Sequence, residues 1–417
     1  MRDVDRIALQ EAYEPYNYVP PKGIEPQRTP REKFAANVAA IRTLKAVEKR
    51  MADGGPHASG EEQNILAGYT GWGGLPEAFD AEKDNWHKEY TELKSLLTEE
   101  EYTAARESTL TAFYTPPEVI TAMFETLRHM GVGAGTILEP SMGVGAFLGQ
   151  SHYYLYKPTT RLYGVELDSL TGRIARQLYQ QANIQITGFE KANLPDSFFD
   201  VAIGNVPFGD YSVSDPQYNR LHFKIHDYFF AKAIDKVRVG GIIAFITTSR
   251  TLDKKSEEVR EYIAARCDFI GAVRLPDSTF KSAGTKVMAD IIFLQKRDRV
   301  QEQDVSWLHT TQTEDGSAIN NYYIEHPEMI CGTMKTVIGP YGPVSTCEAF
   351  ADKPLAEVLK QAMSNLHAEF KFQEIEMQEA GEQEKVIPAE PDVRNYSYTV
   401  KDDKIYYREG AVMRECN

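Results

Sequence analysis

The chain has 417 residues, a formal net charge of −15 and 42% apolar residues, a composition typical of a globular protein. At this length we expect two to three domains, or one large domain with extensions. Four scattered cysteines exclude a disulfide scaffold and a Cys-x-x-Cys metal or redox site. No apolar run approaches the ~20 residues that span a bilayer, and the N-terminus lacks an apolar signal core, so we expect a cytoplasmic protein with no membrane partner.

The negative charge argues at first against a nucleic-acid partner, because a surface that binds phosphates should be basic. Charge is uneven, however: residues 21–50 hold eight Lys and Arg against three acids, whereas residues 369–392 hold eight acids against two lysines. The basic stretch keeps helical apolar spacing from Phe34 to Leu44. It is therefore either a solvated helix face or a phosphate contact, and both interpretations stay open here.

In chain order, residues 1–110 read as a helical N-terminal extension that contains this basic segment and a Gly/Trp-rich turn at 69–76. Residues 111–296 then alternate short β-rich runs with helical segments. The predicted strands are 136–139, 161–166, 183–187, 199–204, 241–247, 269–275 and 289–295. The predicted helices are 116–130, 169–182, 226–237 and 256–267. This alternation predicts an α/β fold with a doubly wound, mostly parallel, Rossmann-like sheet.

The last two strand runs have no long helix between them, so the final strand is expected to run antiparallel in an edge hairpin. Residues 297–370 look like an irregular α+β extension with a helix at 355–370. Residues 371–392 resemble an acidic linker, and 393–417 a short β-hairpin-like end. Because the chain stops abruptly after this hairpin, we expect a fragment of a longer protein.

A candidate nucleotide site follows the first strand, where Gly143-x-Gly145 leads into a helix. Glycines let the backbone approach a ligand, and the helix N-terminus offers free N–H groups. The second strand ends at Glu166, whose two oxygens can accept both hydroxyls of a ribose. An ordinary glycine turn and a surface carboxylate at the start of a helix are the alternative interpretations.

A candidate catalytic segment follows the fourth strand: Asn205, Val206, Pro207 and Phe208. Asn205 offers a side-chain carbonyl, and Pro207 biases Val206 to an extended conformation that turns its backbone carbonyl outward. These two acceptors can hold an –NH2 group while Phe208 stacks on a flat ring. The alternative interpretation is a proline-containing strand-to-loop turn.

Together these motifs resemble the S-adenosylmethionine-dependent amino-group DNA methyltransferases, whose motif is Asn-Pro-Pro-Tyr/Phe. The order is that of the adenine-specific subgroup, in which the methionine-binding motif comes first, here Ala112–Pro117. The segment Leu138–Gly145 resembles the family's Asp-Pro-Ala-Cys-Gly-Ser-Gly loop. The turn Tyr69–Pro76 is similar to one in large methylase/helicase proteins of phages, plasmids and conjugative elements.

The resemblance implies that S-adenosylmethionine is the cofactor and that an adenine, flipped out of DNA, is the substrate. Asn205 and the Val206 carbonyl would hold the adenine amino group, and Phe208 would stack on the ring. Thr115 would contact the methionine carboxylate of the cofactor, Glu139 its ammonium and Glu166 its ribose. The residues implied to line the cofactor pocket are Tyr114, Thr115, Glu139, Pro140, Ser141, Gly143, Gly145, Glu166, Leu167, Phe189, Glu190 and Asn205. No metal is implied.

Target recognition is carried less clearly by the sequence. Five cations lie on loops after sheet strands, where they either contact DNA phosphates or are ordinary solvated side chains. They are Arg250, Lys254, Lys255, Lys281 and Lys286.

The leading hypothesis is a DNA adenine-N6 methyltransferase from a mobile element, with DNA as partner and a helicase domain in the same full-length protein. One alternative uses the Asn-x-Pro-Phe chemistry on a protein glutamine amide. Another is a catalytically silent DNA-binding or anti-restriction module of a larger helicase-type protein.

Overall fold

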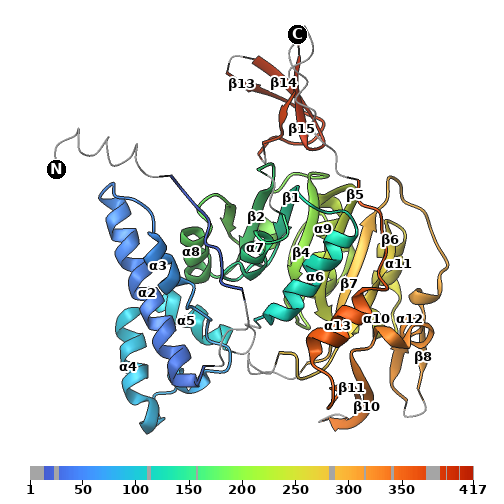
Figure 1. Cartoon of the computed structure of the whole chain (residues 1–417), viewed down its shortest axis with the longest axis horizontal. Coiled ribbons are helices and arrows are strands. Elements are labelled where there is room, and N and C mark those ends of the chain that lie inside the picture. Colours follow the sequence, from blue (N-terminus) through green and yellow to red (C-terminus); the bar gives the residue numbers. More distant parts are fainter. Residues whose placement is uncertain are drawn as a thin grey trace.

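The computed structural model describes residues 14–22, 28–109, 114–155, 158–280, 287–313, 316–339, 342–371, 386–390, 392–402 and 404–416. Its centre is a seven-stranded sheet with the strand order β3-β2-β1-β4-β5-β7-β6 (Figure 1). The strands are β1 (Thr136–Glu139), β2 (Arg161–Glu166), β3 (Asn183–Ile186), β4 (Phe199–Asn205), β5 (Val237–Thr248), β6 (Cys267–Leu275) and β7 (Ala289–Lys296).

Parallel pairing joins β3, β2, β1, β4 and β5, and β7 runs antiparallel between β5 and β6. The doubly wound α/β fold is thus confirmed, and so is the antiparallel direction of the last strand. The edge strand, however, is β6 and not the last strand. Strand β7 lies between β5 and β6, and its apolar residues are buried.

The central strands β1 and β4 are buried on both faces of the sheet, and their apolar residues, such as Ile137, Leu138 and Ile203, lie in the core. The chain order moves from β1 outward to β3, then back to β4 and outward to β6. Right-handed crossovers therefore place the helices of the two halves on opposite faces. The carboxyl ends of β1 and β4 flank the point where the order reverses, which is where such sheets bind ligands. We call the edge formed by the carboxyl ends of the parallel strands the catalytic edge.

The helices of this part are α6 (Pro117–His129), α7 (Ala146–Ser151), α8 (Ser169–Leu178), α9 (Ile225–Lys236), α10 (Arg250–Asp253) and α11 (Glu258–Ala264). The expected helices at 116–130 and 226–237 agree with α6 and α9 within one residue at each end. The one expected at 169–182 ends early, because Tyr179 leaves the helical conformation and its neighbours pair with the N-terminal segment.

The N-terminal region is a set of helices beside the β3 end of the sheet (blue in Figure 1). They are α2 (Pro30–Ala52), α3 (Gly60–Leu66), α4 (His87–Leu96) and α5 (Glu99–Ser108). Thr29, Ser59 and Thr98 each begin a helix with a reciprocal capping box, and caps of this kind contribute about 1 kcal/mol each. The helices bury a core around Trp72 that continues onto α8.

The basic segment 21–50 is engaged within this helical region. Four of its cations form ion pairs with acids of α3, α4 and α5, at N···O distances of 2.7 to 3.1 Å: Arg31–Glu89, Arg42–Glu92, Lys45–Glu101 and Arg50–Glu62. The sequence left two interpretations of the basic segment open. The structure favours a helix face whose cations pair with neighbouring helices, and it does not favour a phosphate-binding surface.

Beyond the central sheet, the chain forms β8 (Thr310–Gln312), β9 (Ala318–Asn320), α12 (Asn321–Glu325), β10 (Gly332–Gly339), β11 (Gly342–Ala349) and α13 (Leu355–Met363). Helix α13 packs on α6, and the segment after it bonds to the sheet through Gln295 and Arg238. Strands β10 and β11 form a regular two-stranded ribbon in a stretch that looked irregular in the sequence. Its base is buried at Gly332 and Cys347, but most of its other residues are exposed, so the stretch lacks the apolar alternation by which strands are recognised.

The last strands form a separate four-stranded sheet, at the opposite end of the central sheet from the β10–β11 ribbon (Figure 1). They are β12 (Val386–Pro388), β13 (Tyr398–Lys401), β14 (Lys404–Glu409) and β15 (Val412–Cys416). The guanidinium group of Arg408, in β14, lies 5.0 Å from the ring centroid of Phe198, the residue just before β4. This contact joins the four-stranded sheet to the central sheet. In the described part of the chain, no helix is both long and apolar enough to cross a membrane.

Candidate active site

Asn205, the last residue of β4, is held from two sides at the catalytic edge. The Ser141 hydroxyl donates to its backbone carbonyl at 2.7 Å, and its side-chain Nδ2 donates to the Thr115 hydroxyl at 3.2 Å. Among the described residues, nothing bonds to its buried side-chain oxygen Oδ1. A buried carbonyl without a donor costs about 1–3 kcal/mol, so this oxygen is suited to receive a donor from a bound molecule.

The residues after Asn205 continue the strand and then turn along the edge. The Val206 N–H donates to the Ile246 carbonyl at 3.0 Å, which keeps the backbone extended beside β5. Phe208 is half-buried, and its ring meets Phe280 edge-on with the centroids 6.5 Å apart. Phe280 comes from the segment after β6. No local sequence pattern predicts this contact, because it joins two residues far apart along the chain.

The glycine loop after β1 has the backbone geometry that only glycine adopts readily. Gly143 has φ +54° and Gly145 has φ +84°, and Gly145 begins α7. A Cβ on Gly145 would lie 2.4 Å from the Tyr179 ring, whereas a Cβ on Gly143 would meet no atom within 4 Å. The space beside Gly143 is therefore open, and a ligand can approach the backbone there.

Glu166, at the end of β2, ties this loop to the neighbouring strand. Its Oε2 accepts the Gly143 N–H at 2.7 Å and its Oε1 accepts the Asp168 N–H at 2.8 Å. Each carboxylate oxygen keeps a further lone pair for a ligand donor. Burial raises the pKa of Glu166 to about 7, against the backbone donors of Asp168, Gly143 and Leu167, which favour its charged form. The next residue, Leu167, is exposed and offers an apolar surface at the same edge.

Glu139, at the end of β1, lies deeper. Its side chain is 2% exposed, and its Oε2 accepts the Leu148 N–H at 3.2 Å, inside the first turns of α7. Burial raises its pKa well above the ordinary value, and the nearby charge of Glu166 adds to the effect. A cation placed beside it would favour the charged form. The following Pro140 is buried beside Gly204.

The N-terminal region reaches the site through the Gly/Trp-rich turn. A Cβ on Gly71 would lie 2.7 Å from the Tyr114 hydroxyl, so the turn lies directly against that side chain. The buried Asn37 of α2 holds the turn: its Nδ2 donates to the Gly71 carbonyl at 2.5 Å, and its Oδ1 accepts the Thr70 N–H at 2.8 Å. Tyr114 and Thr115 are thus backed by helices. Residues 112 and 113 of the same motif lie outside the described residues.

Phe189 and Glu190 follow β3. The Phe189 ring is buried in the core against Phe229, with centroids 4.9 Å apart, and does not present an open face. The Glu190 carboxylate folds back over its own loop, since a Cβ on Gly188 would lie 2.3 Å from both of its oxygens. A cofactor contact by these two residues stays a prediction.

The five loop cations separate into three groups. Arg250 and Lys255 are exposed beyond β5. Lys254 forms an ion pair with the fully buried Asp227, so its charge serves the fold. Lys281 and Lys286 lie outside the described residues.

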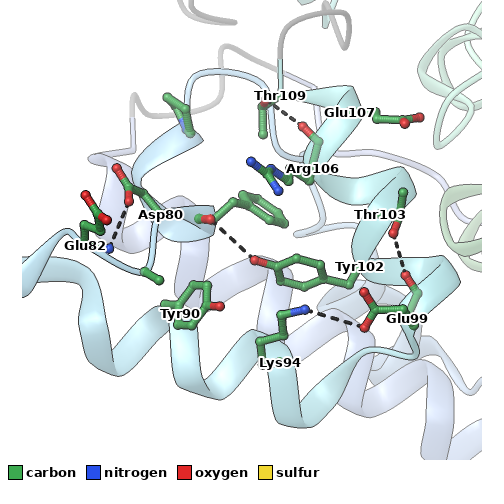
Figure 2. A pocket seen from close by; sticks show the side chains of 13 residues that line it. Asp80, Glu82, Tyr90, Lys94, Glu99, Tyr102, Thr103, Arg106, Glu107 and Thr109 are labelled. Carbon is green, nitrogen blue, oxygen red and sulfur yellow. Dashed lines mark hydrogen bonds and ion pairs between the residues drawn. The ribbon is translucent and has the colours of Figure 1, made fainter.

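A hollow of about 940 Å³ lies elsewhere, between α4, α5 and the turn before them (Figure 2). Its polar groups largely satisfy one another: the Tyr102 hydroxyl donates to the Phe79 carbonyl at 3.4 Å, and Lys94 pairs with Glu99 at 3.5 Å. Of the motif residues it contains only Pro76, at the end of the Gly/Trp-rich turn, and none of the residues predicted to bind the cofactor or the substrate, so the candidate active site is the catalytic edge. Among the described residues, no group of three or more His, Cys, Asp or Glu side chains is arranged to hold a metal ion.

The residues of the catalytic edge fit S-adenosylmethionine. The open space beside Gly143, the acid Glu166 with free lone pairs, and the exposed Leu167 suit a nucleoside. The buried Glu139 and the Thr115 hydroxyl suit the amino-acid end of the molecule.

Comparison with known proteins agrees with the motifs. A curated relative, the "Defense against restriction protein B" of Escherichia phage P1, is 26% identical over 265 residues, which cover 62% of this chain and 10% of that protein. This chain therefore spans about a tenth of the length of that relative.

Solved structures with a similar arrangement include a class I S-adenosylmethionine-dependent methyltransferase of Listeria monocytogenes (TM-score 0.41, 17% identity, 66% of this chain and 90% of that one). They also include a type I restriction-modification methyltransferase subunit of Streptococcus thermophilus (TM-score 0.40, 17% identity, 70% of this chain and 69% of that one). The family model described as "N-6 DNA Methylase" matches residues 96–337, which is more than half of the chain. The chain belongs to the N-6 DNA methylase family, and its cofactor is S-adenosylmethionine.

Proposed function

We propose that this chain methylates the exocyclic N6 amino group of adenine in DNA. The observation that carries the proposal is the buried, unbonded Oδ1 of Asn205 at the carboxyl end of β4. Nδ2 of the same amide donates to the Thr115 hydroxyl, and Oδ1 has no donor among the described residues, so in this proposal Oδ1 accepts a hydrogen from the substrate. An amino group attached to a flat ring that stacks on Phe208 would supply this hydrogen.

The chemistry follows from the two acceptors. The lone pair of the adenine amino nitrogen is delocalised into the ring, which makes the nitrogen a poor nucleophile. The Asn205 Oδ1 and the Val206 carbonyl accept its two hydrogens, which draws the nitrogen toward tetrahedral geometry and frees the lone pair. The cofactor supplies an electrophilic methyl group. As the N–C bond forms, the bond between the methyl group and the cofactor sulfur would break, and its electron pair would stay on the sulfur. The nitrogen then loses one proton to solvent, and no covalent bond to the protein is needed. Positioning and electrostatics supply the rate.

The cofactor half of the edge would hold the methyl donor in place. In this proposal the Glu166 carboxylate accepts the ribose hydroxyls through its remaining lone pairs, and Leu167 covers the adenine ring of the cofactor. Thr115 and Glu139 receive the carboxylate and the ammonium of its methionine part. A charged ammonium beside Glu139 would offset the burial that now raises its pKa.

The target adenine must leave the duplex to reach Asn205, and Phe208 would then stack on it. Base–aromatic stacking contributes about 1–3 kcal/mol, which helps to offset the unstacking cost. The exposed Arg250 and Lys255 would contact phosphates beside the flipped nucleotide.

The test is to express the chain in cells that lack adenine methylation and to sequence the modified bases of their DNA. We expect N6-methyladenine at a defined site, and none with the Asn205→Ala variant. In vitro, tritiated S-adenosylmethionine should label adenine in duplex DNA. Label that appears in a protein glutamine while the DNA stays unlabelled would replace adenine with an amide as the substrate.

A second candidate function is favoured by the relative named for defence against restriction, and by Val206 in place of the first proline of the usual motif. In this alternative the chain is a catalytically silent, DNA-binding module of a longer mobile-element protein that also carries a helicase part. Titration calorimetry with S-adenosylmethionine separates the two: micromolar binding supports the methyltransferase, and absence of binding supports the silent module.

A further inference from the structure

The proposed chemistry does not use the β10–β11 ribbon. Both strands are eight residues long and pair in register from Gly332↔Ala349 to Gly339↔Gly342. Eight residues of antiparallel strand extend about 27 Å. In Figure 1 the ribbon projects from the molecule at the end of the sheet opposite the β12–β15 sheet.

The base of the ribbon is attached to the catalytic edge. The Asp277 N–H donates to the Cys347 carbonyl of β11 at 2.8 Å, and the Thr346 hydroxyl donates to the Asp277 carboxylate at 3.2 Å. Asp277 begins the segment that carries Phe280, whose buried ring meets Phe208 of the catalytic segment. The ribbon is therefore continuous with the part of the active site that contains Asn205 and Phe208, which we call the target half.

The outer part of the ribbon is apolar on both faces. Ile338 is 93% exposed, and Val337 and Val344, which are paired across the strands, are 47% and 50% exposed. Side chains alternate between faces along a strand, so Ile338 points away from the Val337–Val344 pair. Residues 336–345 include no charged side chain. Isolated exposed apolar residues are ordinary. Three of them at the uncharged outer end of a ribbon whose base adjoins the active site indicate a surface that contacts another molecule.

We propose that the β10–β11 ribbon enters duplex DNA beside the target adenine and that Ile338 contacts the base stack where the adenine leaves it. The inference rests on the proposed function, because only a DNA substrate brings a base stack to this edge. The major groove of B-DNA is about 12 Å wide and admits a two-stranded ribbon. Apolar side chains are the ones that wedge between base steps, whereas phosphate contacts need charge.

The test compares Ile338→Ser with Val400→Ser. Val400 is also a β-branched residue, 71% exposed, but lies in β13 of the sheet at the other end of the molecule. Both variants should fold, because neither side chain is buried. The probes are a 30-base-pair adenine-containing duplex, which carries the methylated site once that is sequenced, and its single strand. Binding is measured by fluorescence anisotropy.

We expect Ile338→Ser to raise the Kd for the duplex about tenfold. The Kd for the single strand should rise less than about twofold, because a single strand has no stack of base pairs for Ile338 to contact. Val400→Ser should match the wild type on both. Equal duplex affinity for Ile338→Ser and wild type would overturn the inference, and would point to a protein partner for the ribbon.

Binding is measured without catalysis. A wild type that binds the duplex but transfers no methyl group would defeat the proposed function alone, while the comparison of the variants still decides the role of the ribbon.

Discussion

The two halves of the catalytic edge are built in different ways. In the cofactor half, Glu166 bonds to Gly143 and Asp168, all within one strand–loop–helix unit and its neighbour. In the target half, Asn205 depends on Thr115, 90 residues earlier, and Phe208 on Phe280, 72 residues later. The Glu166 contacts can therefore form from the segments around β1 and β2, whereas the contacts of Asn205 and Phe208 exist only once more distant parts of the chain have met.

This difference separates the expected phenotypes. Changes in the target half should reduce methyl transfer while cofactor binding survives, and changes in the cofactor half should act first on cofactor affinity. The predictions below run from the largest expected effect to the smallest.

Asn205→Ala removes the acceptor that holds the adenine amino group. We expect kcat to fall at least about 10²–10³-fold, the size of effect seen when one preorganised polar partner of a reacting group is removed. Calorimetry should still detect cofactor binding. Asn64→Ala, on the exposed side of α3, is the matched control. A variant that keeps full activity would eliminate the two-acceptor mechanism.

Phe208→Ala removes the ring that stacks on the flipped base. Stacking worth about 1–3 kcal/mol corresponds to a loss of about 5- to 150-fold in kcat/KM for DNA. Phe208→Trp should retain most of the activity because it keeps an aromatic face. If the alanine and tryptophan variants lose activity equally, packing against Phe280 rather than stacking on the base is the function of the ring.

The affinity for S-adenosylmethionine should depend on pH through Glu166. Its pKa is raised to about 7, so the carboxylate that accepts the ribose hydroxyls predominates above that pH and is lost as the pH falls. A group with this pKa is about 90% ionised at pH 8 and about 10% at pH 6, so affinity should drop by up to about tenfold between them. Calorimetry at the two pH values checks this.

Glu166→Gln should bind the cofactor more weakly at pH 8 and show no such pH dependence, because its amide does not titrate. A wild type whose affinity is flat from pH 6 to pH 8 would mean that the ribose is held elsewhere.

Asn37→Ala tests whether the N-terminal helices support the site. The change leaves the Gly71 carbonyl and the Thr70 N–H without their buried partner, at about 1–3 kcal/mol each. Urea denaturation should show this loss of stability, with Asn64→Ala near wild type. Because Gly71 lies against Tyr114, cofactor affinity should weaken as well. Unchanged affinity in a destabilised variant would restrict Asn37 to a role in folding.

Several parts of the fold could be predicted because their signal is local. Strands β1 and β2 have the expected bounds, since a short apolar run between turn residues leaves few alternatives. Glu166 and Asn205 could be singled out because each ends a strand, and the ends of parallel strands meet at one edge. The ribbon β10–β11 was missed, because most of its residues beyond the buried Cys347 at its base are exposed, and its residues show no alternation. The strand order at the β6 edge was also missed, because β6 and β7 are both apolar.

The sequence by itself determined the chemistry offered at this edge: two acids, a glycine loop and an Asn-x-Pro-Phe segment, each at the end of its own strand. Only the tertiary structure decided which atoms remain available. Nδ2 of Asn205 donates to Thr115 while its Oδ1 has no donor among the described residues, and burial raises the pKa of Glu166 to about 7. Four of the eight cations of the basic segment are used in ion pairs for the same reason. Burial and pairing depend on neighbours far away along the chain, which local sequence does not encode.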